Sequence, residues 1–156
     1  MLSNLGNTFI IVALLISFSL VFFSFKEFKT NNNSIPGKIY KISLLQLFFT
    51  ASSFIILLLA YVLSDFSLAN VYENSHTNKP LFYKISGTWG NHEGSLLLWI
   101  NILVLFSSLF LFINKNNDKD FKILTLLFQN ILVIIFIIFL LSNSNPFSKL
   151  FPIPLE

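Results

Sequence analysis

The chain has 156 residues, of which 54% are hydrophobic and only 11% are charged, with a formal net charge of +3. Soluble domains carry about 25% charged residues, so this composition indicates an integral membrane protein. The absence of cysteine excludes disulfides, thiolate metal sites and cysteine nucleophiles. Every basic residue is a lysine in a short segment between apolar runs, which argues against nucleic-acid binding.

Four apolar runs without charged residues predict four transmembrane helices, at residues 8–25, 44–63, 95–113 and 123–141. Each run has the length of about 17–25 residues that a helix needs to cross the hydrocarbon core. None alternates as a barrel strand would. The first run has neither a basic segment before it nor a cleavage site after it, so we expect a retained helix. The expectation is a single all-α membrane domain over residues 1–156.

Lysine placement predicts the orientation. Seven lysines lie in the loops at residues 26–41 and 114–122, against three in residues 64–93 and the tail at 142–156. The positive-inside rule therefore puts the two lysine-rich loops in the cytoplasm or matrix. Both termini and the long loop at residues 64–94 are then expected on the opposite, outer side.

The outer loop contains two segments with a local pattern. Partial alternation in Asp65–Tyr72 predicts a short strand or an extended piece. Pro80 suits the first position of a short helix, in which Phe82, Ile85 and Trp89 would form one apolar stripe. We expect this helix to lie along the outer membrane surface. The tail at residues 142–156 contains three prolines and is expected to be extended.

The segment from Gly87 to Trp99 holds the candidate site residues. Its glycines would permit close backbone approach or positive φ, and its tryptophans suit a water–lipid boundary. No histidine follows four residues after His92, so a zinc-protease site is not indicated, and no nucleophile elbow or phosphate loop is present. We expect no catalytic residue and no metal ligand. The candidates are Trp89, Gly90, His92, Glu93, Gly94 and Trp99.

Two interpretations of this segment remain open on the residues alone. In the first, Asn91 caps the third helix, Glu93 lies in its first turn, and the glycines serve packing. In the second, an outer pocket of aromatic residues, with His92 as a polar contact, binds a flat, apolar, anionic ligand such as a porphyrin.

Polar residues also occur within the predicted spans. We expect them to form hydrogen bonds between helices. A quinone or proton route is the alternative, but no carboxylate within the spans supports it. These residues are Gln46, Thr50 and Ser53, which share a helix face, and Asn101, Gln129 and Asn130.

Four strings together resemble the N-terminal part of the CcmF/NrfE family of cytochrome c haem lyase subunits. They are Asp65–Tyr72, Pro80–Lys84, Thr88–Trp99 with its Trp-Gly-Asn-His-Glu-Gly-Ser core, and the Asn-Pro-Phe of Ser144–Ser148. The resemblance covers nearly the whole chain, including the order and spacing of the four helices.

The resemblance implies a role in System I cytochrome c maturation, in a bacterial inner membrane or a mitochondrial inner membrane. Members of the family receive haem from the chaperone CcmE. They join the haem to the Cys-x-x-Cys-His thiols of apocytochrome c, which CcmH-type partners present on the periplasmic or intermembrane side. The family's Trp-rich loop and haem-ligating histidines lie beyond the segment that corresponds to Ser144–Ser148. Haem is therefore expected in the assembled complex, with no ligand from this chain.

The resemblance leaves three expectations for the chain as a whole. It is an N-terminal fragment or a split subunit of a haem lyase, in which Trp89, His92 and Glu93 shape the edge of a cavity that a second polypeptide completes. Alternatively, it is the remnant of a truncated gene. The third possibility is a structural membrane subunit without a haem role.

Overall fold

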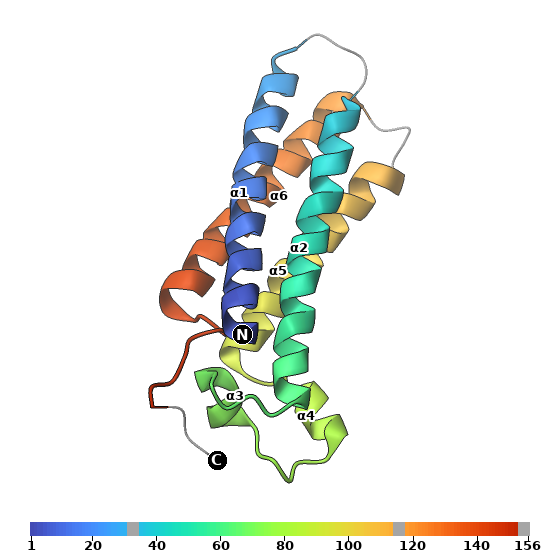
Figure 1. Ribbon diagram of the computed structural model, residues 1–156. Coiled ribbons are helices and arrows are strands. Elements are labelled where there is room, and N and C mark those ends of the chain that lie inside the picture. Colours follow the sequence, from blue (N-terminus) through green and yellow to red (C-terminus); the bar gives the residue numbers. More distant parts are fainter. Residues whose placement is uncertain (31–34, 114–117, 153–156) are drawn as a thin grey trace.

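The computed structural model describes residues 1–30, 35–113 and 118–152. Four long helices run up and down in a bundle (Figure 1): α1 (Leu2–Phe28), α2 (Gly37–Val62), α5 (His92–Ile113) and α6 (Lys119–Asn143). All four are long and apolar enough to cross a membrane. Helices α1 and α5 each contact both α2 and α6, so the four helices close into a ring around the core.

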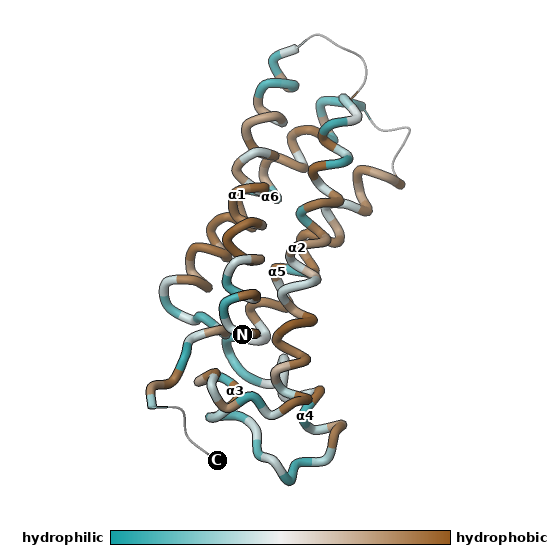
Figure 2. Tube along the Cα trace, in the orientation of Figure 1, coloured by the Kyte–Doolittle hydropathy of each residue, from teal (hydrophilic) through white to brown (hydrophobic). Residues whose placement is uncertain are grey.

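Helices α1 and α6 extend beyond both ends of the predicted spans, and α5 begins three residues earlier than predicted. Helix α2 begins seven residues before the run at 44–63 and ends at Val62, one residue before the end of that run. Figure 2 shows the reason: apolar residues fill the middle of the helices, and hydrophilic residues gather at their ends. A charged residue ends an apolar run in the sequence, but it does not interrupt the backbone hydrogen bonds of the helix, so the helix continues beyond the run. Glu27, for example, lies inside the last turn of α1, where Lys119 pairs with its carboxylate at 3.2 Å.

Helix α2 ends in a Schellman motif. Ser64 has a positive φ of 54°. Its N–H donates to Tyr61 O at 3.2 Å, and the Asp65 N–H donates to Ala60 O at 2.9 Å. These two bonds satisfy carbonyls that would otherwise lack a partner at the helix end. The Lys84 ammonium donates to the Ser64 hydroxyl at 2.6 Å, which ties the turn to the next part of the outer loop.

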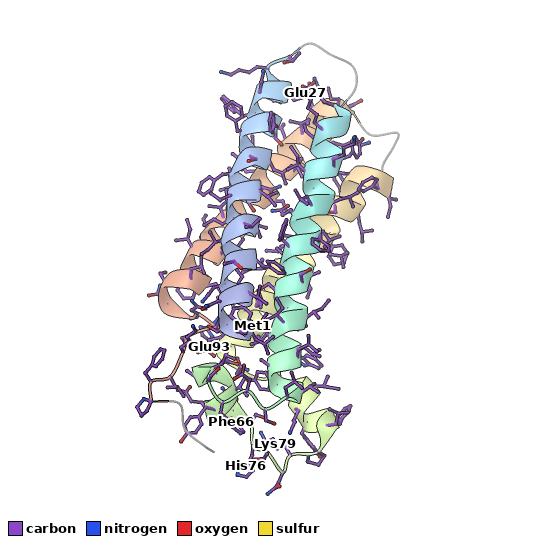
Figure 3. All side chains as sticks on the ribbon, viewed as in Figure 1. Met1, Glu27, Phe66, His76, Lys79 and Glu93 are labelled. Carbon is purple, nitrogen blue, oxygen red and sulfur yellow. The ribbon has the colours of Figure 1, made fainter. Side chains whose placement is uncertain are left out.

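Two short helices, α3 (Ala69–Asn74) and α4 (Leu81–Gly87), cover the end of the bundle where Met1 lies (Figures 1 and 3). The helix expected after Pro80 is present as α4, and its position at a membrane surface stays a prediction. Two alternatives were expected over Asp65–Tyr72: the strand is wrong, and extended backbone is present at Leu68. Only Leu68 makes a β-bridge, and helix α3 begins at the next residue. Leu68 and Val71 are both fully buried, and their separation of three residues is a helical spacing.

The chain after α6 packs against the bundle. Phe147 is fully buried and belongs to the main core. Its carbonyl accepts a hydrogen bond of 2.7 Å from the Ser3 hydroxyl of α1. Lys149 forms the antiparallel bridge with Leu68, so the segment is extended there, as expected, but it also closes the outer end of the bundle.

Polar side chains join the helices inside the bundle, as expected for Gln46, Gln129 and Asn130. The expectation is wrong for Thr50 and Asn101, whose side chains donate to carbonyls of their own helices. The Gln46 amide of α2 donates to Ser17 Oγ of α1 at 2.6 Å and to Asn130 Oδ1 of α6 at 2.8 Å. Gln129 of α6 donates to Leu103 O of α5 at 3.2 Å. Such bonds contribute about 0.6 kcal/mol each in a membrane, so their main effect is on helix register.

Candidate functional site

The first turn of α5 is capped by Asn91. Its Oδ1 accepts the Gly94 N–H at 2.7 Å, and its carbonyl accepts the Ser95 N–H at 3.0 Å. Glu93 lies in the first turn, where a carboxylate is favoured by the helix dipole. The capping interpretation of Asn91 and Glu93 is therefore confirmed.

A buried network of side chains connects this turn to α2 and α3. The Asn70 amide of α3 donates to Asn91 Oδ1 and to Glu93 Oε2, both at 2.9 Å. The Tyr61 hydroxyl of α2 donates to Asn70 Oδ1 at 2.5 Å and accepts from Asn91 Nδ2 at 2.8 Å. Glu93 is thus held as part of the scaffold. Sequence reasoning missed Asn70 and Tyr61 because both lie far along the chain from Asn91.

The glycines of this segment permit close approach rather than unusual dihedral angles. None of them has a positive φ within the described residues, so that part of the expectation is wrong. A Cβ on Gly94 would overlap the Thr88 carbonyl oxygen, and one on Gly87 would lie 3.1 Å from the Tyr61 ring. A larger residue at Gly94 would displace the Thr88 backbone from the start of α5, and one at Gly87 would push α4 away from Tyr61 of α2.

An open pocket of about 400 Å³ lies at the end of the molecule formed by α3 and α4, which is the end predicted to face the outer side. The candidates Trp89 and Gly90 line it, and Trp89 is 42% exposed. The other lining residues were not predicted, although Tyr83, Ser86, Gly87 and Gly90 follow the spacing of one helix face. The full lining consists of Asn74, Lys79, Tyr83, Ser86, Gly87, Trp89 and Gly90.

The remaining candidates do not line this pocket. His92 and Trp99 are exposed on α5, seven residues apart and so close to one face, with Trp99 61% exposed. Glu93 and Gly94 lie in the buried network instead. The structure thus separates the candidates into a pocket wall, a structural cap and an open helix face.

The wall of the pocket combines aromatic side chains with one ammonium group. Aromatic rings from Trp89 and Tyr83 and the ammonium of Lys79 are typical of contacts with a flat anionic molecule. The Lys79 ammonium donates to Asn74 O at 2.8 Å, which holds it at the wall. In the described part of the chain, no group of three or more His, Cys, Asp or Glu side chains could hold a metal ion.

Comparison with known proteins gives a consistent picture. No protein-family model matches the chain. It is 46% identical over 123 residues to the cytochrome c-type biogenesis protein CycK of Rhizobium meliloti, covering 79% of this chain and 18% of CycK. It is 34% identical over 157 residues to NrfE of Haemophilus influenzae, covering 100% of this chain and 25% of NrfE. CcmF of the same organism is 30% identical over 152 residues, covering 97% of this chain and 24% of CcmF.

One solved structure has the same fold. It is a cytochrome c haem lyase CcmF, which superposes with a TM-score of 0.84 at 24% identity over 96% of this chain and 25% of that chain. The chain therefore spans between 18% and 25% of the length of these relatives, and the match is consistent with an N-terminal CcmF-like portion. The four apolar helices and this match make it a multi-pass membrane protein. By these similarities, the chain belongs to the family of cytochrome c-type biogenesis proteins that includes CycK, NrfE and CcmF.

Proposed function

We propose that the chain is the N-terminal fragment or a split subunit of a haem lyase that attaches haem to apocytochrome c. The observation that carries the proposal is its identity of 46% to a cytochrome c-type biogenesis protein over 123 residues. Because the chain spans only part of such proteins, the catalytic work is assigned to the assembled complex. The membrane would be a bacterial inner membrane or a mitochondrial inner membrane, with both termini on the outer side.

Within that complex, the outer end of the chain forms part of the wall of a haem cavity. Trp89 and Gly90 line the pocket of about 400 Å³, and His92 and Trp99 are exposed on α5, which begins two residues after Gly90. Glu93 and Gly94 act indirectly, because they fix the start of α5 from which His92 and Trp99 project. A second polypeptide completes the cavity and supplies the haem ligands. CcmE, a CcmH-type subunit and apocytochrome c are the further partners.

The experiment tests whether the outer residues affect the reaction without affecting assembly. In cells that carry the assembled complex, we expect His92→Ala and Trp89→Ala to lower the yield of holocytochrome c while the subunit remains at its normal abundance. Haem staining measures the yield, and immunoblotting measures the abundance. If each residue makes one of the stronger contacts in the cavity, worth about 1.4 kcal/mol, the expected loss is about tenfold.

Two residues at the same end serve as matched controls. His76 is exposed in the outer loop and Phe82 is 75% exposed on α4, and neither lines the pocket. Substitution of either by Ala should leave the yield unchanged. Yields that fall only in step with abundance would instead favour a structural membrane subunit, whose Trp-Gly-Asn-His-Glu-Gly corner serves packing alone.

A further inference from the structure

A second cavity lies at the other end of the bundle, between the last turns of α1 and the first turn of α2. Its volume is about 170 Å³. In Figure 3, Glu27 marks this end of the bundle, and Glu93, His76 and Lys79 lie at the opposite end. The lining residues are Phe23, Lys26, Glu27, Pro36, Lys38 and Ile39.

The cavity carries an excess of positive charge. Lys26 and Lys38 are exposed, and within the described residues neither has a carboxylate at ion-pair distance. Glu27 faces the same cavity, but the Lys119 ammonium neutralises its carboxylate at 3.2 Å. That ammonium is also fixed by the carbonyls of Glu27 and Thr30, at 3.0 and 2.7 Å. The two cavity lysines are therefore free to bind an anion.

The start of α2 adds to this charge. Among the described residues, no side chain caps its first turn, and that turn contains no acidic residue. The unsatisfied N–H groups of a helix start carry a partial positive charge. This potential acts on the same space as the ammonium of Lys38, which belongs to that first turn.

The lining of the cavity also includes apolar side chains. Phe23 is partly buried, and Ile39 is only 1% exposed and belongs to a core cluster. The cavity also lies at the level where the apolar parts of α1 and α2 give way to hydrophilic residues (Figure 2). A ligand here would meet both ammonium groups and apolar side chains.

We propose that this cavity binds a phosphate-type anion, the chemistry shared by the headgroup of an anionic phospholipid and a soluble phosphate ester. Basic pockets between transmembrane helices recognise such headgroups. The apolar side chains of Phe23 and Ile39 favour the lipid, because an acyl chain can continue from the phosphate along the outside of α1 and α2. The site is distinct from the outer pocket and is independent of haem.

The test uses the full chain in detergent, titrated with phosphatidylglycerol or phosphatidylcholine and followed by native mass spectrometry. The cavity variant is Lys26→Gln with Lys38→Gln. Its matched control is Lys29→Gln with Lys41→Gln, which removes the same charge at the same end but does not touch the cavity lining. A lysine near a lipid headgroup contributes roughly fivefold in affinity, so we expect a loss of roughly 25-fold for phosphatidylglycerol in the cavity variant only.

A competition arm identifies the source of the phosphate. Glycerol phosphate that displaces phosphatidylglycerol from the wild-type chain, and binds the cavity variant more weakly, would assign the site to soluble phosphate esters. Failure of glycerol phosphate to compete would assign it to the lipid. Equal losses in the two double variants, or equal binding of the two lipids by the wild-type chain, would overturn the proposal. If circular dichroism shows that the cavity variant has lost helicity, Lys38→Gln alone replaces it, because Lys38 is exposed. The expected result is then roughly a fivefold loss of affinity for phosphatidylglycerol, and no loss would overturn the proposal.

Discussion

At the scale of single residues, the corner before α5 depends on the absence of a side chain at Gly94. The Thr88 carbonyl oxygen occupies the space that a Cβ would need. This contact lets Asn91 cap the helix while its amide also reaches the Tyr61 hydroxyl. The exposed His92 therefore starts from a rigid turn, which is what a residue that contacts a ligand requires.

We predict that Gly94→Ala destabilises the folded state by about 1–3 kcal/mol, because the backbone at Thr88 must move to admit the methyl group. Urea titration in detergent micelles, followed by far-UV circular dichroism, measures this free energy. The matched control is Gly37→Ala, since in the described part of the chain no atom apart from its chain neighbours and its own helix backbone lies within 4 Å of the Cβ position there. Equal stability of the two variants would contradict the proposed close contact.

At the scale of elements, the chain after α6 behaves as part of the bundle. Phe147 enters the core beside Gly6 of α1, where a Cβ would overlap its ring. The Ser3–Phe147 hydrogen bond and the Leu68–Lys149 bridge hold the two sides of this contact. The pairing of a small residue with a large one fixes where the segment crosses α1.

We predict that Gly6→Ala and Phe147→Leu are each destabilising, and that the double variant is less destabilised than the sum of the two. The overlap created by the first change lies where the second removes ring atoms, so the changes compensate in part. A double-mutant cycle in the same urea assay should give a coupling free energy of about 0.5–3 kcal/mol. Simple additivity would show that the two residues do not meet.

At the scale of the whole molecule, the four spans place the two lysine-rich loops at one end of the bundle and the helices α3 and α4 at the other. These two ends lie on opposite sides of any membrane that the spans cross. Met1, Glu93, His76 and Lys79 share one end, and Glu27 lies at the other (Figure 3). The outer pocket and the phosphate cavity are thus exposed to different compartments. A haem role requires the first of these ends to face the side where apocytochrome c is matured.

We predict that an impermeant maleimide added from the outer side labels Asn4→Cys and Asn78→Cys but leaves Thr30→Cys unlabelled. All three positions are exposed, and the chain has no native cysteine, so each variant reports one site. Labelling after permeabilisation provides the control for reactivity. The opposite pattern would reverse the orientation and exclude the outer pocket from haem attachment.

Local patterns in the sequence were sufficient to predict the four spans, the helix after Pro80 and the cap at Asn91. Each depends on residues within one run or one turn, whose hydrogen bonds and burial are decided by near neighbours. Local patterns did not decide Asp65–Tyr72, because a short apolar alternation fits a strand, an extended piece or a short helix. In the structure Leu68 is extended, and α3 begins at the next residue and buries Asn70 and Val71.

Only the tertiary structure decided how these elements meet. Ser3 and Phe147 are 144 residues apart, and Asn70 and Glu93 are 23 apart, so no local pattern could pair them. The lining of the outer pocket, and the cavity lined by Lys26 and Lys38, likewise depend on which segments of the chain come together in space. By itself the sequence determined which segments enter a membrane, because the transfer of apolar side chains out of water is a property of each segment. It left open the contacts between segments, because these depend on the shape of side chains brought together from distant positions.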